Sequence, residues 1–223
     1  MGEEELDAAD VAEIVARKER SIALLVREGI PYLESLPAIE PAATVPRRSN
    51  QEVALRALAL AVVAAKAATR DQEQAQRLIE AYRLDDAFTP KERMFIDNRL
   101  PAPRDCTQLT WRIECSWVML WALGFADALG RPDEQVAPGD VIDIIEARGR
   151  DRFVAEANLR PTAELLDAAD LLYRYHWAVR DAKFCGSAPL PTLNPDVVVE
   201  WHYALNWLIG YNQLEWDEMS TDT

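Results

Sequence analysis

The sequence has little cysteine and no cysteine motif. Its three cysteines, Cys106, Cys115 and Cys185, are odd in number, and no two of them stand in a CxxC pair. A disulfide framework or a zinc ribbon is built on paired cysteines. A chain of 223 residues with 49% hydrophobic residues can also bury a core without cross-links. We therefore expect free thiols and a reducing, cytoplasmic location.

Positive charge is scarce, above all toward the C-terminus. Lys and Arg total 24 against 38 Asp and Glu, a net charge of −14, and neither Lys nor Arg follows Lys183. Such a surface repels phosphate backbones and anionic headgroups, so we expect no nucleic acid and no membrane as partners. In the simpler interpretation the acidity serves solubility. In the other, it attracts a basic protein partner.

Segments for export or membrane insertion are also missing. The N-terminus, Met1–Glu5, is acidic and lacks the apolar core of a signal peptide. The uncharged run Cys115–Ala126 is shorter than the about 20 apolar residues of a membrane helix, so it predicts a core helix instead.

The motifs of common cofactor and catalytic sites do not occur. The chain has no GxGxxG, no glycine-rich loop ending in Gly-Lys, no GxSxG and no HExxH. Only two histidines are present, His176 and His202, so a metal site would depend on carboxylates brought in by the fold. We expect no metal and no cofactor. Cys185 could act as a nucleophile beside His176 only in an electropositive setting, and its neighbours, apart from Lys183, predict an inert thiol.

What the sequence does contain is helical periodicity. Apolar residues between Val11 and Val26, Val15 among them, recur three and four apart, which predicts a helix that packs this face on the core and ends at Gly29. Alternating strand patterns and internal repeats are absent. We predict an all-α, single-domain multi-helix bundle of about seven to eight helices spanning residues 1–223.

Local signals place several helix boundaries. Ser49 with Glu52 and Thr89 with Glu92 have capping-box spacing, and Asp71 is a cap candidate. Residues 1–9 are expected to fray, and 30–48 form a proline-rich connector. Further helices are expected at Cys106–Leu129, Gly139–Arg148, Pro161–Lys183 and Pro195–Tyr211, with 150–160 fitting either loop or helix. The innermost helices are expected at 53–68, 109–126 and 196–211.

Polar residues on apolar helices are the candidate site. They are Glu114, Asp170, Arg174, His176, Glu200, His202 and Asn206. A buried charge needs a partner, so we predict that Glu114 pairs with Arg174. The residues form either a buried network that fixes helix register or a polar pocket that binds a ligand or transfers protons.

The last residues combine aromatic and acidic side chains. Trp216 and Leu214 are unfavourable in water, so we expect the segment that carries Asp217 and Asp222 to dock on the fold.

Four stretches together resemble the DUF4272 family, a mainly bacterial family of unknown function. They are Trp111–Glu114 with Leu120–Gly124, Leu172–Ala178, Glu200–Trp207, and Trp216–Asp217 with Thr221–Thr223. One departure is Trp201, where the family pattern favours arginine, so any role of that arginine is absent here or supplied elsewhere. The resemblance implies a helical fold and transfers no catalytic residue.

Two classes of function fit these observations. The first is a non-enzymatic protein-binding or regulatory module whose acidic C-terminal half engages a basic protein. The alternative is a small-ligand binder or hydrolase-type enzyme with a polar pocket around Arg174, His176, Glu200 and His202, where arginine would hold a carboxylate or phosphate. The oligomeric state, monomer or homodimer, stays open.

Overall fold

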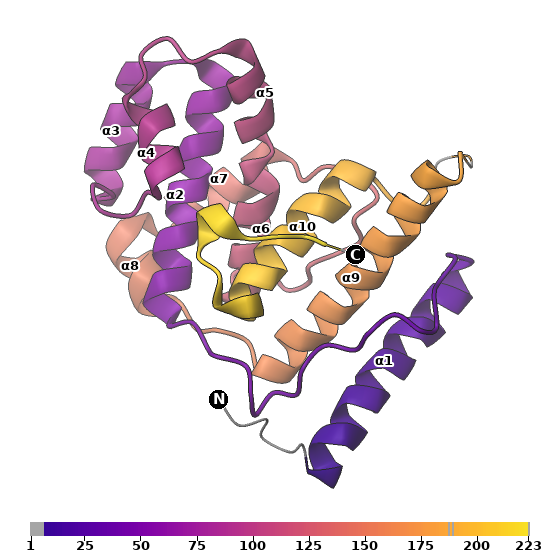
Figure 1. The fold of residues 1–223 in the computed structure, drawn as a ribbon. Helices are drawn as coiled ribbons and strands as arrows, with labels where there is room; N and C mark the ends of the chain where they lie inside the picture. The colour runs from indigo at the N-terminus through magenta and orange to yellow at the C-terminus, as the bar shows by residue number, and fades with distance from the viewer. Residues whose placement is uncertain (1–6, 187, 189, 223) are drawn as a thin grey trace.

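A computed structural model of the protein describes residues 7–186, 188 and 190–222. These residues form helices α1 to α10 and two short 3₁₀ helices, and none of them lies in a strand (Figure 1). The helices are α1 (Ala8–Glu28), α2 (Asn50–Thr69), α3 (Gln72–Tyr82), α4 (Pro90–Asp97), α5 (Pro103–Thr110), α6 (Arg112–Ala122), α7 (Pro138–Glu146), α8 (Gly149–Glu156), α9 (Thr162–Phe184) and α10 (Pro195–Leu208), then η1 (Tyr211–Gln213) and η2 (Trp216–Glu218). The all-α class is confirmed, but the helices are more numerous than the seven or eight expected.

The extra helices come from breaks that the periodicity did not reveal. The helix expected at Cys106–Leu129 is divided into α5 and α6, with a turn at Trp111. The Thr110 hydroxyl donates to the carbonyl of Cys106 at 2.6 Å, a contact that often bends helices. Gly124 then ends α6 early, because its φ of 76° is left-handed and Phe125 N donates back to Leu120 O. The ambiguous segment 150–160 contains most of α8.

The predicted boundary signals are confirmed. Ser49 and Thr89 each form a capping box, and the Asp71 carboxylate accepts from Gln74 N at 2.8 Å. Gly29 ends α1 with a φ of 69°. Residues 30–49 contain no helix, as expected for the connector. Of the nine residues expected to fray, 1–6 lie outside the described residues and the others include the start of α1.

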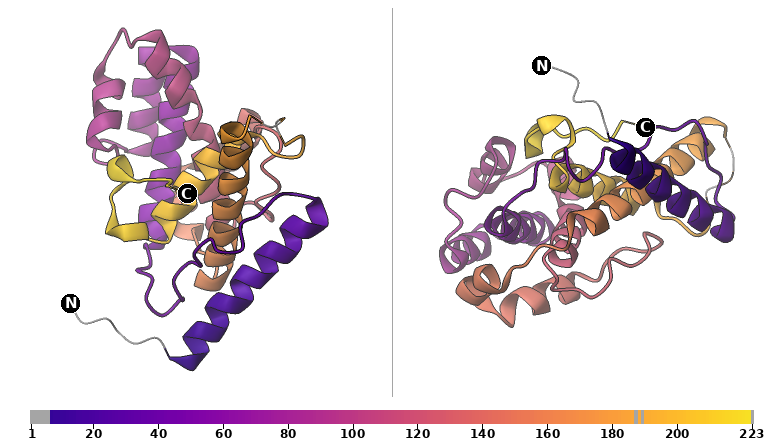
Figure 2. Two further views of the ribbon diagram at one scale, coloured as in Figure 1. Left: turned by 45° about the vertical axis from the view of Figure 1, so that its right-hand side comes forward. Right: turned by 90° about the horizontal axis from the view of Figure 1, so that it is seen from below.

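Helix α2 lies at the centre of the helix packing. This helix contacts α3 to α8, while α10 packs between α6 and α9. The innermost helices are those expected: Leu60 on α2, Leu120 on α6 and Leu205 on α10 are fully buried, and they belong to one contiguous cluster. Figures 1 and 2 show α1 lying along α9 at one edge of the molecule.

The orientation of α1 differs from the expectation. The helix buries Arg17, Ser21 and Leu25, whereas Val11 and Val15 are each 48% exposed and Val26 is 57% exposed. Charged Arg17 can lie inward because its guanidinium donates to the carbonyls of Ile39 and Glu40 and pairs with Glu13. The connector therefore supplies polar partners that the helix sequence alone does not show.

Candidate functional site

Arg112 is placed by the break between α5 and α6. It is the first residue of α6, so the turn at Trp111 sets the direction in which its side chain leaves the helix. Glu200 and Tyr203 stand three residues apart on α10 and therefore share one face toward it. Trp216 comes from η2, which runs back over the same region. Helices distant in sequence thus meet at one guanidinium group.

The Arg112 guanidinium is held by charge on one side and by aromatic rings on the other. Nη1 lies 2.8 Å from Oε2 of Glu200, and both side chains are 17% exposed. The guanidinium carbon lies 4.7 Å from the ring centroid of Tyr203 and 5.8 Å from that of Trp216. Burial alone would lower the pKa of Arg112, but Cys115 and Glu200 raise it above its ordinary value. The cation is permanent and fixed in orientation.

Arg112 also keeps donors that the protein does not use. Among the described residues, its hydrogen bonds all leave from Nη1, to Glu200 and to the sulfur of Cys115. The guanidinium has five N–H donors in a planar fork. Nε and Nη2 therefore remain available to an acceptor from outside the chain.

The thiol of Cys115 contacts both members of the Arg112–Glu200 pair, and it is not poised to act as a nucleophile. Its thiol donates to Oε2 of Glu200 at 3.0 Å and to the Glu200 carbonyl at 3.4 Å. Burial, and then the Glu200 carboxylate, raise the pKa of this thiol well above its ordinary value. At neutral pH it stays protonated and helps to fix the glutamate.

The C-terminal segment docks at this place, as its composition predicted. Trp216 is only 3% exposed, and the Tyr203 hydroxyl donates to its carbonyl. The Asp217 carboxylate accepts from Lys91 N at 2.9 Å and from the Thr89 hydroxyl at 2.7 Å, at the N-terminus of α4. The ammonium of Lys91 donates in turn to the Asp217 carbonyl at 2.6 Å.

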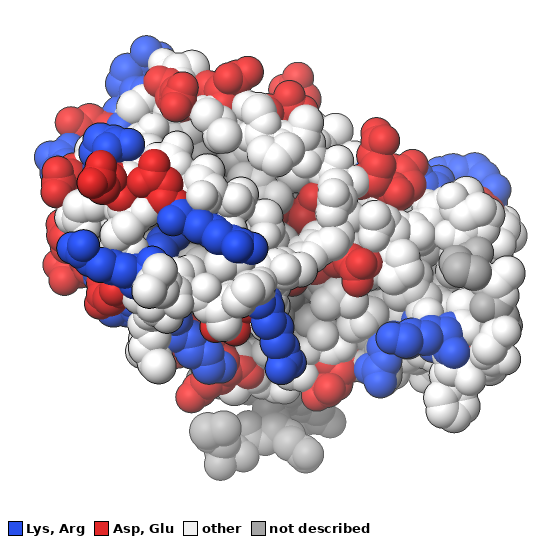
Figure 3. Space-filling view, turned by 90° about the horizontal axis from the view of Figure 1, so that it is seen from above, with Lys and Arg blue, Asp and Glu red and all other residues white. Residues whose placement is uncertain are grey.

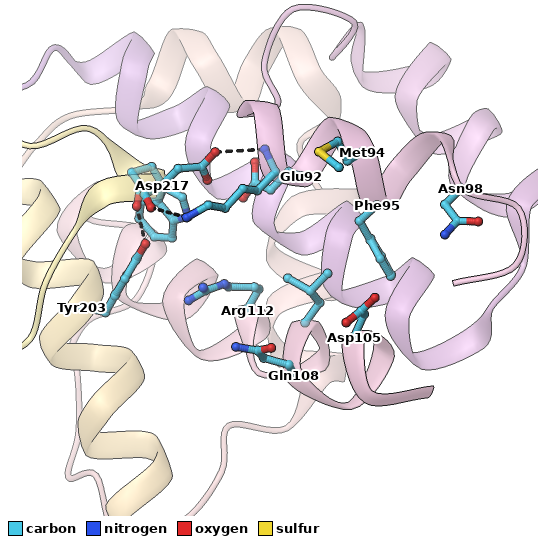
Figure 4. Close-up of a pocket in the computed structure, with 12 residues that line it drawn as sticks. Glu92, Met94, Phe95, Asn98, Asp105, Gln108, Arg112, Tyr203 and Asp217 are labelled. Carbon is cyan, nitrogen blue, oxygen red and sulfur yellow. Dashed lines mark hydrogen bonds between the residues drawn. The ribbon is translucent and has the colours of Figure 1, made fainter. Parts of the chain in front are cut away.

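These groups surround a cavity of about 440 Å³ between α4, α5, α10 and η2 (Figure 4). Its lining divides into an apolar part, with Met94, Phe95, Leu109 and the two aromatic rings, and a polar part. The polar part holds Lys91, Glu92, Asn98, Asp105, Gln108, Arg112 and Asp217. Figure 4 shows Arg112 and Gln108 beneath the end of α4, opposite Glu92. We call this the Arg112 pocket.

Glu114 does not pair with Arg174, so that prediction is wrong. Its carboxylate accepts from the Trp201 indole at 2.8 Å and from Val136 N at 2.9 Å. Burial raises the pKa of Glu114, and the two hydrogen bonds partly oppose that shift. The indole N–H of Trp201 thus supplies a neutral donor to the buried carboxylate.

Arg174 instead pairs with Asp170, one turn earlier on α9. Both oxygens of Asp170 accept from the guanidinium, from Nε and from Nη2, at 2.8 Å each. The two side chains are at most 1% exposed, and Arg174 also reaches the carbonyl of Pro37 at 3.4 Å. This closed pair joins the connector to α9.

His176 and His202 form a second closed contact, between α9 and α10. Their Nδ1 atoms lie 2.8 Å apart, and the Asn206 amide donates to Ser220 O at 2.9 Å. Burial, then Arg180, lowers the pKa of His176 to about 4, and burial, then His176, lowers that of His202 to about 3. His202 and Asn206 line a cavity of about 250 Å³ beside the connector, while His176 borders a separate groove.

The predicted site residues therefore fall into separate clusters. Glu114, the Asp170–Arg174 pair and the histidine pair have partners within the fold, and only Glu200 adjoins the Arg112 pocket. Sequence reasoning missed Arg112 and Tyr203 as site residues. Both lie in stretches that carried the family resemblance, and three of those stretches, Trp111–Glu114, Glu200–Trp207 and Trp216–Asp217, meet here.

Metal-ligand clusters and membrane-spanning helices are two further features that bear on function. Over 7–186, 188 and 190–222, no three or more His, Cys, Asp or Glu side chains gather as metal ligands would. Within those ranges no helix has both the length and the apolar character to cross a membrane.

The fold and the site define an all-helical protein with a cation-bearing pocket closed by its C-terminal segment. The chain belongs to the DUF4272 family, a domain of unknown function, whose model matches residues 17–219. Neither the search of curated proteins nor the search of solved structures found a match.

Proposed function

We propose that this chain is a small-ligand-binding protein whose ligand presents a carboxylate or phosphate to Arg112 and an apolar body to the rings around it. The observation that carries the proposal is that only part of the Arg112 guanidinium is used within the fold. Its Nη1 donates to Glu200, while Nε and Nη2 have no acceptor among the described residues. The same side chain lines the pocket. Arginine recognises planar and tetrahedral oxyanions through two parallel donors. The cavity volume lies within the range of small-molecule sites.

The setting strengthens such a contact. Arg112 is mostly buried, so an anion that reaches it leaves water and meets a lower dielectric. The Tyr203 and Trp216 rings hold the guanidinium plane without competing for its donors. Met94, Phe95 and Leu109 offer the apolar contact for the remainder of the ligand.

Binding rather than catalysis fits the groups present. The Cys115 thiol beside Arg112 is held protonated, and the histidine pair adjoins other cavities. Glu200 is engaged by Arg112 and by that thiol. The proposal therefore assigns the pocket a holding role.

The test is calorimetric titration with benzoate and phenyl phosphate, which combine a charged group with an aromatic body. Benzamide, which has the same ring without the charge, is the matched control ligand. Arg112→Gln should abolish binding, and Arg112→Lys should weaken it, because lysine lacks the planar fork. Arg104→Gln, at an exposed arginine outside the pocket lining, should leave binding unchanged. Equal binding of benzamide and benzoate, or no binding at all, would contradict the proposal.

A second candidate role is capture of a basic protein, and α7 is the observation that favours it. Between Arg131 and Arg148 the chain has five acidic residues and no basic one, and all five are exposed. Exposed Ile142 lies among them. On the face seen in Figure 3, by contrast, acidic and basic side chains are interspersed.

Charge reversal on α7 tests this second role. A lysine-rich amphipathic peptide should bind the protein in a salt-sensitive manner, and the double variant Asp140→Lys with Asp143→Lys should lose that binding. Glu73→Lys, at an exposed glutamate on α3, is the matched control. If the α7 double variant and Glu73→Lys lost peptide binding equally, the effect would come from net charge, and α7 would not be the binding site.

A further inference from the structure

The Arg112 pocket contains carboxylates that the protein leaves without a full set of partners. Two cations and three acids line it: Lys91, Arg112, Glu92, Asp105 and Asp217. The Asp217 carboxylate is used within the fold, because it is bound at the N-terminus of α4. Glu92 and Asp105 are therefore the acids that can meet a group from outside the chain.

Glu92 is buried in the wall of the pocket and uses only one of its oxygens. It is 3% exposed, and its Oε2 accepts from Arg56 Nη2 and from Thr89 N. Within the part of the chain that the structure describes, Oε1 has no partner. A buried acceptor without a donor destabilises a protein, so a ligand that brings a donor gains free energy there. Met94, which also lines the pocket, is 76% exposed and flexible enough to admit such a group.

Asp105 lies at the end of the pocket away from Arg112. It is exposed in the first turn of α5, and its carboxylate forms no hydrogen bond or ion pair with any described residue. Figure 4 shows Asp105 on the Asn98 side of the pocket, with Phe95 pointing toward it from α4. This end therefore offers a carboxylate beside an aromatic ring, which suits a cation.

The separation of the two ends sets the length of the ligand. Asp105 and Arg112 are seven residues apart, and Trp111 between them has helical backbone angles, φ −65° and ψ −14°. At about 1.5 Å per residue, the two Cα atoms lie about 10 Å apart. Phe95 and Leu109 supply apolar surface in the same lining. A ligand that reaches both ends thus has several methylene groups between its charges.

We propose that the Arg112 pocket binds an amino acid with a cationic side chain, of which free lysine is the simplest example. This ligand class depends on the anion-binding role proposed above for Arg112, and it specifies the other groups of the ligand. The carboxylate takes the unused Nε and Nη2 donors of Arg112, the α-ammonium donates to Oε1 of Glu92, and the side-chain ammonium lies at Asp105. The methylene groups pack on Phe95 and Leu109.

The charge of the protein favours this ligand over a purely anionic one. The chain has a net charge of −14, and acids outnumber bases in the pocket lining by three to two. A ligand with two ammonium groups and one carboxylate has a net positive charge, so the field of the protein attracts it. A simple carboxylate or a phosphate ester is repelled on approach.

Calorimetric titration with lysine and three matched ligands tests each charge separately. Norleucine lacks the side-chain ammonium of lysine, 6-aminohexanoate lacks the α-ammonium, and cadaverine lacks the carboxylate. Lysine should bind about threefold to fivefold tighter than norleucine, as an exposed ion pair allows. It should bind at least about tenfold tighter than 6-aminohexanoate, because Oε1 of Glu92 is buried. Cadaverine should not bind measurably.

Substitutions of the two acids assign these preferences to residues. Asp105→Asn should lower the affinity for lysine to that for norleucine and leave norleucine binding unchanged. Glu92→Gln keeps the capping box and should reduce the preference for lysine over 6-aminohexanoate. Comparing two ligands within one variant separates this effect from any loss of folding. Asp97→Asn removes an exposed carboxylate of α4 outside the lining, and as the matched control it should change nothing.

Contrary results are distinct for this ligand class and for the role of Arg112. If norleucine binds and requires Arg112 but lysine binds no tighter, the lysine assignment is overturned and the anion-binding role stands. If neither lysine nor benzoate binds, both are overturned. Equal loss of lysine binding in Asp105→Asn and Asp97→Asn would overturn the assignment, because the effect would come from net charge. Cadaverine binding as tight as that of lysine would do so too, because the carboxylate would then contribute nothing.

Discussion

The Nδ1 atoms of His176 and His202 lie 2.8 Å apart in a buried contact between α9 and α10. One imidazole must donate and the other accept, so at least one ring of the pair is neutral. Two protonated rings would set N–H against N–H at this distance. The packing of α9 against α10 therefore depends on pH, because protonation of both rings would disrupt this contact.

Stability should fall as the solution is acidified, with a measurable contribution from this pair. The folded-state pKa values are about 4 for His176 and about 3 for His202, below the ordinary 6.5. At pH values between these folded-state pKa values and 6.5, the histidines of the unfolded chain bind protons that those of the folded chain do not. The free energy of unfolding is thus highest above about pH 6.5 and declines below it, by at most about 1.4 kcal/mol per pH unit for each histidine.

Urea unfolding at pH 7, 6 and 5 measures this slope. The double variant His176→Gln with His202→Gln removes both titrating groups, so its slope should be shallower than that of the native protein. Carboxylates contribute equally to both proteins and cancel in the comparison. Parallel slopes would show that the histidines titrate alike in the folded and unfolded states.

Breaking the Asp170–Arg174 pair should be costly. Asp170→Asn keeps the shape but leaves Arg174 buried without a counter-charge, and we expect a loss of about 3–5 kcal/mol in the free energy of unfolding. The matched control is Glu73→Gln, which removes an exposed pair with Arg77 at the same four-residue spacing and should cost at most about 1 kcal/mol. Urea denaturation of the two variants gives both values. If both variants lost only a small amount of unfolding free energy, Arg174 would have found another partner or water in the Asp170→Asn variant.

The C-terminal segment should contribute to stability as well as to the pocket. Trp216→Ala removes a side chain that is 3% exposed, and we expect a cost of about 3–5 kcal/mol. Deleting residues 214–223 should lower the melting temperature at least as far. Leu100→Ala, at an exposed leucine, serves as the control. A truncated protein with an unchanged melt would show that the segment is not held in solution.

The thiols should differ sharply in reactivity. Cys185 is exposed, while Cys106 and Cys115 are buried and burial raises the pKa of the Cys115 thiol. Iodoacetamide under native conditions should label Cys185 alone, as read by mass spectrometry, and all three after unfolding. The variant Cys185→Ser should take up no label while folded. Native labelling of Cys115 would falsify its closed packing against Glu200.

Local signals in the sequence predicted the helix boundaries well because the chemistry that sets them is local. The capping boxes at Ser49 and Thr89 and the left-handed Gly29 involve residues at most four apart. The break at Trp111 was missed, since nothing in the apolar pattern from Cys106 to Leu129 marks it. That break directs Arg112 into the pocket, so one missed turn concealed the principal site residue.

The partners of buried charges were much harder to predict. Glu114 met an indole and a backbone amide, and Arg174 met Asp170 on its own helix. The contacts of Glu114 do not follow from spacing, because they depend on which groups the packed helices leave within reach. The four-residue spacing of Asp170 and Arg174 allowed their pair, but spacing alone did not rank it above a partner on another helix. The exposed face of α1 was misplaced for a related reason: Val11 and Leu25 look equally apolar in the sequence, and only the position of α9 separates them.

The Asp217 carboxylate caps a helix that begins 127 residues earlier, at Pro90. During synthesis on a ribosome, α4 and Arg112 emerge long before Asp217 and Trp216 do. Until those residues arrive, the Arg112 pocket has no wall on that side and α4 lacks that cap. The ligand binding proposed for this pocket therefore cannot guide the early stages of folding, because the pocket is complete only when the last helices have been made.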